Sequence, residues 1–331
     1  MPPAIKTTYA LRRVFRLSEP SVLIDCNDHN AENPLWHPQH KCLYWSDIPE
    51  GRLFRYYPGN EDFEEIYSGE PVGGFTIQAD GALLLFKTEG TVEIWKEDTD
   101  GQAETITVIP NIPEAKGTRF NDAIADRKGR VFSGIMATDE VPGRLYRIEI
   151  DGSYQSVVED LLLPNGMAFD ADYTHFYLTD SDRRTIYRFD YDEESGELSN
   201  QQTHIKMPAD EGVPDGMTID SEGYIWSARW DGSGVYRYQP DGKQHSKIVL
   251  PTEKVSCITF GGDNYDEMFI STARGDDAPE PGEPGYNEAA GDIFHLKSDV
   301  KGRPERLSCI KLEQYSEAYQ AQAMQTETAK R

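Results

Sequence analysis

The chain has 331 residues, with 33 Lys and Arg against 58 Asp and Glu, so its formal charge at pH 7 is −25. This charge disfavours nucleic acid as a partner, because phosphate binding depends on Lys and Arg side chains that neutralise the backbone. No apolar run approaches the ~20 residues that a membrane-spanning helix needs, and the segment from Met1 to Leu17 lacks the apolar stretch of a secretory signal. We therefore expect a cytoplasmic protein without membrane contact, whose four cysteines are reduced thiols.

Along the chain, one pattern recurs six times: a turn with Asp, Gly or a charged residue, a short apolar strand, and a second strand rich in Tyr, Phe and Arg. The spacings between the first apolar residues of successive copies are 40, 48, 45, 49 and 43 residues. A period of about 40 to 50 residues is typical of a propeller blade. The 28 glycines and 20 prolines disfavour long helices. The sequence therefore predicts an all-β, six-bladed β-propeller that occupies residues 1–331 as a single domain. The six marker residues are Leu43, Leu83, Val131, Phe176, Ile225 and Met268.

The two ends of the chain are expected to close the ring. We predict a strand from Arg13 to Ile24 that pairs with a C-terminal strand near Arg306 to Lys311, because a ring of sheets has to be fastened. The polar tail, residues 313–331, is expected to be a short helix or frayed. Residues 276–290 are rich in Pro, Gly and acidic side chains and predict a long loop, either an ordinary surface insertion or a lid over the central cavity.

Polar side chains occupy nearly the same position in four copies of the repeat. Glu32 and Asn165 each lie 11 residues before the marker of their copy, and Asn121 and Asp215 lie 10 before theirs. Because the innermost strand of each blade lines the axial channel, these side chains should converge near the axis. Carboxylate and amide oxygens suit Ca²⁺, Mg²⁺ or Mn²⁺, although Zn²⁺ also accepts carboxylates. A cation there would polarise a bound carbonyl, as in metal-assisted hydrolysis.

Each of these residues also has a plainer interpretation. Asn165-Gly166 and Asp215-Gly216 are dipeptides of tight hairpin turns, and Asn121-Asp122 is compatible with a turn. Glu32 alone would be a surface charge. The shared position in four copies favours a common site, because turn residues have no reason to keep a carboxylate or an amide at one phase of the repeat.

Four segments of the chain carry a more specific signal: Ala31–Trp36, Arg119–Asp122, Leu163–Phe169 and Val213–Asp220. They resemble the signature segments of the family that contains regucalcin (senescence marker protein) and the gluconolactonases, and the similarity extends from about Val22 to Gly302. The resemblance implies a six-bladed propeller with one divalent metal ion.

The resemblance also implies roles for individual residues. Glu32, Asn165 and Asp215 match the metal ligands of the family, and Asp215 also matches its proposed general base. Arg119 and Asn121 match the residues that hold the oxygens of the substrate.

An acidic residue near Asp139 and Glu140 often contacts substrate in the family. We assign this role to Glu140, with a solvated turn as the alternative. The chain departs from the family pattern at Asn33 and Ala123, where Gly is common, which leaves the pocket wall and the choice of substrate open.

The expected function is therefore the divalent-metal-dependent hydrolysis of a sugar (aldono) lactone to the open-chain acid, by a monomer or weak homodimer. Ca²⁺ is the expected ion, with Zn²⁺, Mg²⁺ and Mn²⁺ as alternatives. Two other functions share these features: a non-catalytic calcium-binding propeller, and a propeller esterase or phosphotriesterase. The second would favour a more apolar pocket than Arg119 and Asn121 indicate.

Overall fold

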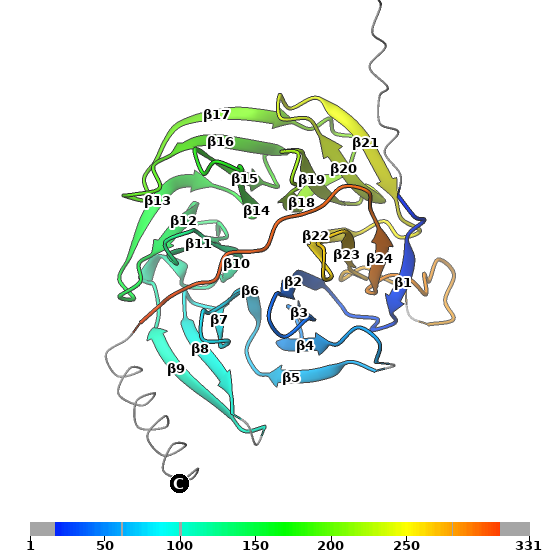
Figure 1. The fold of residues 1–331 in the computed structure, drawn as a ribbon, viewed down its shortest axis with the longest axis horizontal. Coiled ribbons are helices and arrows are strands. Elements are labelled where there is room, and N and C mark those ends of the chain that lie inside the picture. Colours follow the sequence, from blue (N-terminus) through cyan, green and yellow to red (C-terminus); the bar gives the residue numbers. More distant parts are fainter. Residues whose placement is uncertain (1–16, 61, 99–100, 280, 312–331) are drawn as a thin grey trace, which may run out of the picture.

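The computed structural model describes residues 17–60, 62–98, 101–279 and 281–311. Within these residues the strands form six four-stranded antiparallel sheets around a central axis (Figure 1). This arrangement confirms the predicted six-bladed β-propeller. The described part of the chain has one short helical turn, η1 (Pro113–Ala115), and it contains no helix that is long and apolar enough to cross a membrane.

Each of the first five blades runs outward from the axis in chain order, as a four-stranded meander. The first contains β2 (Ala31–His37), β3 (Cys42–Asp47), β4 (Arg52–Tyr56) and β5 (Glu64–Ser68). The second contains β6 (Val72–Ile77), β7 (Leu83–Lys87), β8 (Val92–Glu97) and β9 (Ala103–Ile109). The third contains β10 (Phe120–Ala125), β11 (Val131–Ile135), β12 (Gly143–Ile148) and β13 (Tyr154–Leu161). The fourth contains β14 (Pro164–Phe169), β15 (His175–Asp180), β16 (Thr185–Tyr191) and β17 (Leu198–Lys206). The fifth contains β18 (Val213–Ile219), β19 (Ile225–Trp230), β20 (Gly234–Tyr238) and β21 (Gln244–Val249). The sixth contains β22 (Val255–Gly261), β23 (Glu267–Thr272), β24 (Ile293–Lys297) and, on its outer edge, β1 (Ser21–Ile24).

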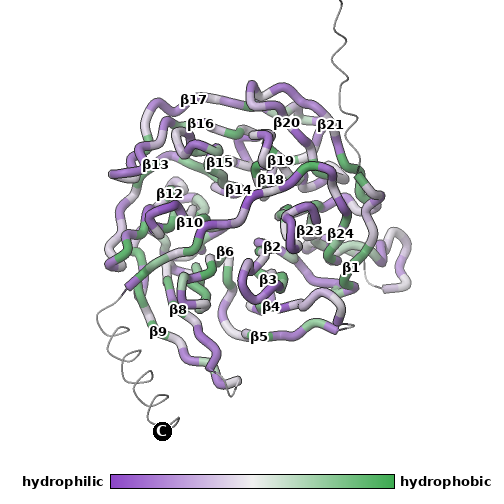
Figure 2. The backbone as a smooth tube through the Cα atoms, in the orientation of Figure 1, coloured by the Kyte–Doolittle hydropathy of each residue, from purple (hydrophilic) through white to green (hydrophobic). Residues whose placement is uncertain are grey.

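The six marker residues all lie in the second strand of their blades and are at most 1% exposed. They join apolar clusters within and between neighbouring sheets, which is where the core of the molecule sits. The outermost strands are more polar. Figure 2 shows β17 as largely hydrophilic, and its side chains are mostly exposed.

As predicted, an N-terminal strand closes the ring by pairing with the last blade, but its partner strand differs from the predicted one. The N-terminal strand β1 pairs antiparallel with β24, where Ser21 lies opposite His295. The segment from Arg306 to Lys311 is not the partner, so that part of the prediction is wrong. The reason is that β24 follows the insertion and forms the free edge of the sixth blade, whereas the chain beyond it leaves the sheet. Residues 1–16 and 312–331, which include part of the predicted strand and the polar tail, lie outside the described residues.

The segment 298–311, here called the crossing segment, runs over the face of the ring opposite the site described below (Figure 1). It leaves the sixth blade and reaches the second, where Ile310 N donates to Gln78 Oε1 at 3.0 Å and Gln78 Nε2 donates back to Ile310 O at 3.1 Å. On the way it contacts the fourth blade, where Arg306 Nε donates to the Tyr173 hydroxyl at 2.8 Å. The crossing segment therefore ties together blades that are not neighbours in the ring.

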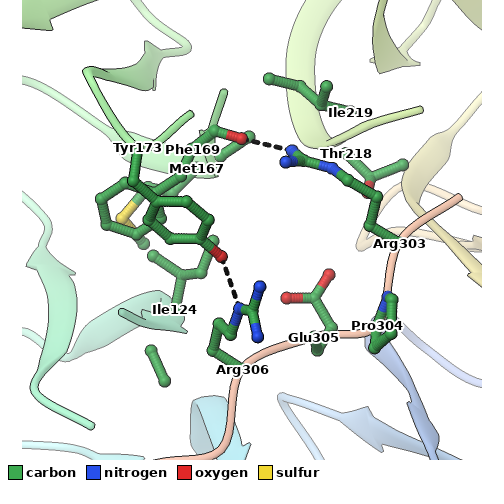
Figure 3. Close-up of a pocket in the computed structure, with 12 residues that line it drawn as sticks. Ile124, Met167, Phe169, Tyr173, Thr218, Ile219, Arg303, Pro304, Glu305 and Arg306 are labelled. Carbon is green, nitrogen blue, oxygen red and sulfur yellow. Dashed lines mark hydrogen bonds between the residues drawn. The ribbon is translucent and has the colours of Figure 1, made fainter. Parts of the chain in front are cut away.

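A carboxylate of the crossing segment lines a cavity on this face of the ring. Figure 3 shows Glu305 between Arg303 and Arg306, and Arg303 donates to the carbonyl of Phe169. Burial raises the pKa of Glu305, and the two arginines oppose that shift. The charge of Glu305 adds to the rise in the pKa of Asp122 that burial causes.

A buried ion pair holds the turn between the first two strands of the fifth blade. Arg237 Nη2 lies 2.6 Å from Asp220 Oδ2, which also accepts the Trp226 indole N–H at 2.9 Å. We expect Asp220→Ala to cost about 3–5 kcal/mol of unfolding free energy, because it leaves a buried guanidinium without this partner. Urea unfolding would measure the loss. The matched control is Asp241→Ala, which breaks the exposed pair with Lys243 in the same blade. Equal midpoints for the two variants would contradict the prediction.

Candidate functional site

A cavity of about 260 Å³ opens at the axis, on the face where the innermost strands begin. The beginnings of four innermost strands and the ends of several second strands supply its wall. Polar side chains outnumber apolar ones in the lining, which consists of Asn30, Glu32, Arg119, Asn121, Met136, Leu163, Asn165, Ser181, Asp182, Val213, Asp215 and Trp230. The polar side chains among them can fix the orientation of a small ligand by hydrogen bonds.

Five of the six predicted site residues meet at this cavity. Glu32 comes from β2, Asn121 from β10, Asn165 from β14 and Asp215 from β18, and all four are at most 9% exposed. Arg119 lies just before β10 and is half-buried. The plainer readings as turn residues or a surface charge are wrong, because these positions lie in or beside the innermost strands.

A register irregularity in every innermost strand explains how these side chains reach the axis. The pairing with the second strand shifts between Glu32 and Leu35, between Pro164 and Met167, and between Pro214 and Met217, and the other three blades have the same feature. A β-bulge leaves a residue unpaired, bends the strand and re-aims its side chain. The bulge thus turns strand residues towards the channel.

The Asn-Gly and Asp-Gly dipeptides belong to these bulges because neighbouring inner strands approach closely there. A Cβ added at Gly166 would lie 2.4 Å from Met217 N, and one at Gly216 would lie 2.3 Å from Cys257 Sγ. Real Cβ atoms do not come this close, so only glycine fits. The glycines therefore allow Asn165 and Asp215 to sit side by side.

Hydrogen bonds connect the site residues into a network. Asn165 Nδ2 donates to Asp215 Oδ1. Asn121 Nδ2 donates to the Pro164 carbonyl at 3.1 Å, and Arg119 Nη1 donates to Asn121 Oδ1 at 2.6 Å. The guanidinium of Arg119 is thereby fixed beside the two carboxylates rather than paired with one of them.

The electrostatics of the site are those of buried, mutually repelling carboxylates. Burial raises the pKa of Glu32 to about 8, and the nearby charge of Asp122 adds to that shift. Burial and the charge of Glu32 also hold the pKa of Asp215 well above its usual range. The pKa of Asp122 rises to about 7, chiefly through burial. The negative charges cost free energy here unless a cation compensates them.

The donor set fits a divalent cation with oxygen ligands. Among the described residues, Glu32 Oε1, Asn165 Oδ1 and Asp215 Oδ2 accept no hydrogen bond, while the second oxygen of each carboxylate is held by an N–H group. The described residues contain no cluster of three or more His, Cys, Asp or Glu side chains suited to a metal, so amide oxygens would have to complete the set. Such oxygen-rich ligation is the preference of hard cations.

The sixth predicted site residue, Glu140, is not brought to the cavity. Its side chain is exposed in the connection from β11 to β12, and Met136 from the same connection lines the wall instead. The expected contact between Glu140 and substrate stays a prediction.

Sequence reasoning missed part of the wall. Ser181, Asp182 and Trp230 belong to it, and each lies at or just beyond the end of a second strand. A search for polar or aromatic residues at the end of the second strand in each repeat could have found them.

The described residues of the loop, 276–279 and 281–290, do not line the central cavity. The loop connects β23 to β24 and lines a separate cavity of about 210 Å³ against the β21–β22 connection. His29 Nε2 lies 2.8 Å from Asp276 Oδ1, and Asn287 Nδ2 donates to the Pro251 carbonyl at 2.8 Å, so the loop is fastened at both ends. In this structure it is a surface insertion beside the site.

The fold and the site together define a six-bladed propeller with a polar axial cavity that holds two buried carboxylates. Residues 30–274 match the family described as the SMP-30/Gluconolactonase/LRE-like region, and the chain belongs to this family. The family resemblance of the four motif segments is thereby confirmed.

Two relatives illustrate how far the likeness extends. The pentonolactonase XacC of Haloferax volcanii is 41% identical over 292 residues, which cover 88% of this chain and 98% of that protein. Human regucalcin is 31% identical over 296 residues, which cover 85% of this chain and 97% of that protein. The chain thus spans nearly the whole length of both.

Solved structures share the fold. A regucalcin from Agrobacterium tumefaciens, described as a calcium-binding protein, superposes with a TM-score of 0.80 at 23% identity, covering 89% of this chain and 98% of that one. A luciferin-regenerating enzyme gives a TM-score of 0.79 at 23% identity, covering 87% and 98%. At 23% sequence identity this structural similarity supports a shared fold only.

Proposed function

We propose that the protein hydrolyses a sugar lactone of the aldono type to the open-chain acid, with the help of one divalent cation at the axis. One observation carries the proposal: Glu32, Asn165 and Asp215 meet Arg119 at a single polar cavity, in a chain that belongs to a family of lactonases and regucalcins. The pentonolactonase relative supports a small lactone as the substrate.

The cation would be held by Glu32, Asn165 and Asp215, whose free oxygens face the cavity. When bound, it supplies Lewis-acid polarisation of the lactone carbonyl and acidifies water. Ca²⁺ is the ion we propose, since the ligands are all oxygens and a structural relative is described as calcium-binding.

The residues of the chain perform the remaining steps. Arg119 and Asn121 bind the oxygens of the lactone and orient its ring. Asp215 accepts a proton from the attacking water as the water oxygen bonds to the carbonyl carbon. The bond between that carbon and the ring oxygen then breaks, and the proton passes to the ring oxygen, which becomes the hydroxyl of the open-chain acid.

The cavity wall favours a hydroxylated substrate. Eight of its twelve side chains are polar, and Arg119 is anchored so that its remaining N–H groups can donate to hydroxyl or carboxyl oxygens.

The test is a metal-replacement assay on a panel of aldonolactones, followed through the acid that each hydrolysis releases. We expect metal-free protein, prepared with a chelator, to show only the uncatalysed rate, and at least one of Ca²⁺, Mg²⁺, Mn²⁺ and Zn²⁺ to restore turnover. Full activity in the chelator would contradict the role of the cation. Binding of the cation without turnover of any lactone would instead indicate a non-catalytic binding protein.

A further inference from the structure

None of the described residues of the second blade lines the cavity at the axis. At the position of its bulge, β6 has Gly73 and Gly74, and a Cβ at Gly73 would lie 1.9 Å from the Phe120 carbonyl oxygen. The inner strand of the third blade therefore packs directly on the backbone of β6. Some other residue has to satisfy the polar groups that remain on this side of the channel.

Asn33 of the first blade fills that place. Its Oδ1 accepts the backbone N–H of Phe75 in β6 at 2.7 Å, and its Nδ2 donates to Asp122 Oδ1 in β10 at 3.3 Å. Its own backbone N–H donates to Glu32 Oε2 at 2.9 Å. One buried residue, 7% exposed, thus connects three blades and holds one carboxylate oxygen of the proposed cation site.

We infer that Asn33 is a positioning residue that sets the geometry of the Glu32 carboxylate for the cation. The inference rests on the proposed cation site. Two features support it. Asn33 adopts φ +50°, a left-handed conformation in which Asn is among the few tolerated side chains. The two partners of its side chain also require one acceptor, for Phe75 N, and one donor, for Asp122 Oδ1. An amide provides both, whereas a carboxylate or a glycine does not.

Three substitutions separate the contacts. Asn33→Gly keeps the backbone conformation accessible and removes both side-chain hydrogen bonds. Asn33→Asp keeps an acceptor for Phe75 N but places a negative charge against Asp122. Asp122→Asn restores a donor opposite the new carboxylate, so the effect of Asn33→Asp should be smaller in that background.

The measurement is Ca²⁺ affinity by calorimetry on the whole chain, together with thermal unfolding in a chelator. Residues that orient metal ligands typically contribute 10- to 100-fold to affinity, so we expect Asn33→Gly to weaken Ca²⁺ binding by at least about tenfold. The matched control is Asn200→Gly. Asn200 also has a left-handed φ, +51°, and it donates to Asp190 Oδ2 at 2.6 Å, but it lies exposed on β17. The Asn200→Gly variant should bind Ca²⁺ with wild-type affinity.

Failure of the inference about Asn33 can be distinguished from failure of the proposed lactonase function. Unchanged Ca²⁺ affinity in Asn33→Gly, with a loss of thermal stability alone, would overturn the inference and assign Asn33 a merely structural role. The inference would also be overturned if Asn33→Asp changed the Ca²⁺ affinity by the same factor with and without Asp122→Asn, because substitutions at two contacting residues should be coupled. Wild-type protein that binds Ca²⁺ but turns over no lactone would defeat the proposed function and leave the inference standing. Wild-type protein that binds none of Ca²⁺, Mg²⁺, Mn²⁺ and Zn²⁺ would overturn both.

Discussion

Asp215→Asn is expected to lower kcat for a sugar lactone by about 10²–10⁴, the range typical for the loss of a positioned catalytic base. Asparagine keeps the shape of the side chain and can still accept through its oxygen, so the fold should be retained. It cannot take a proton from water. Initial rates at saturating lactone and saturating Ca²⁺ would measure the loss, since excess cation compensates for weaker ligation.

A carboxylate-to-amide change elsewhere provides the control for this variant. Asp241→Asn alters an exposed turn of the fifth blade, where Asp241 pairs with Lys243, and it should leave kcat unchanged. Asp215→Asn with full metal-dependent turnover would show that another group acts as the base.

Glu32→Gln is expected to weaken Ca²⁺ binding by more than about 100-fold, beyond the effect typical of residues that only orient a ligand. The reason is the loss of one of the two carboxylates that face the cavity. Calorimetry would measure the affinity. Unchanged affinity would show that the cation binds without Glu32.

The same substitution should have opposite effects on stability with and without the cation. In metal-free protein it removes a carboxyl group whose ionisation is disfavoured by burial and by the charge of Asp122, so Glu32→Gln should unfold at the same temperature as wild type or higher. With Ca²⁺ in excess the order should reverse, because ligand binding stabilises only the protein that binds it. Glu140→Gln is the matched control, since its exposed side chain lies outside the cavity wall. It should show wild-type behaviour in both conditions.

The repeat in the sequence was sufficient to predict the ring and the strands that carry the site. Leu43 and its counterparts fix where each second strand begins, and counting back from them identifies Glu32, Asn121, Asn165 and Asp215 on the innermost strands. The count alternates between 10 and 11 residues, which conceals the bulges. Asn165-Gly166 looks like a turn because the residue types that suit a turn also suit a bulge pressed against a neighbouring strand.

Contacts between blades could not be predicted in this way. Asn33 was recognised only as a departure from the family pattern, and its bonds to Phe75 and Asp122 depend on how three sheets meet at the axis. The crossing segment was misread for a related reason. Its apolar residues, such as Leu307 and Ile310, suggest a strand, but they pack on the far face of the ring instead of extending a sheet.

The pairing of β1 with β24 sets an order of events when the chain is made on the ribosome. Strand β1 finds its partner only after β2 to β23 have been synthesised, so the ring stays open until late. Contacts so remote in sequence are slow to form. Until then β1 has no partner and the outer edge of the sixth blade is incomplete, so both of these strand edges can recruit strands from other chains. A chain that stops before Ile293 would keep these edges permanently, and we expect it to aggregate rather than to accumulate as a five-bladed protein.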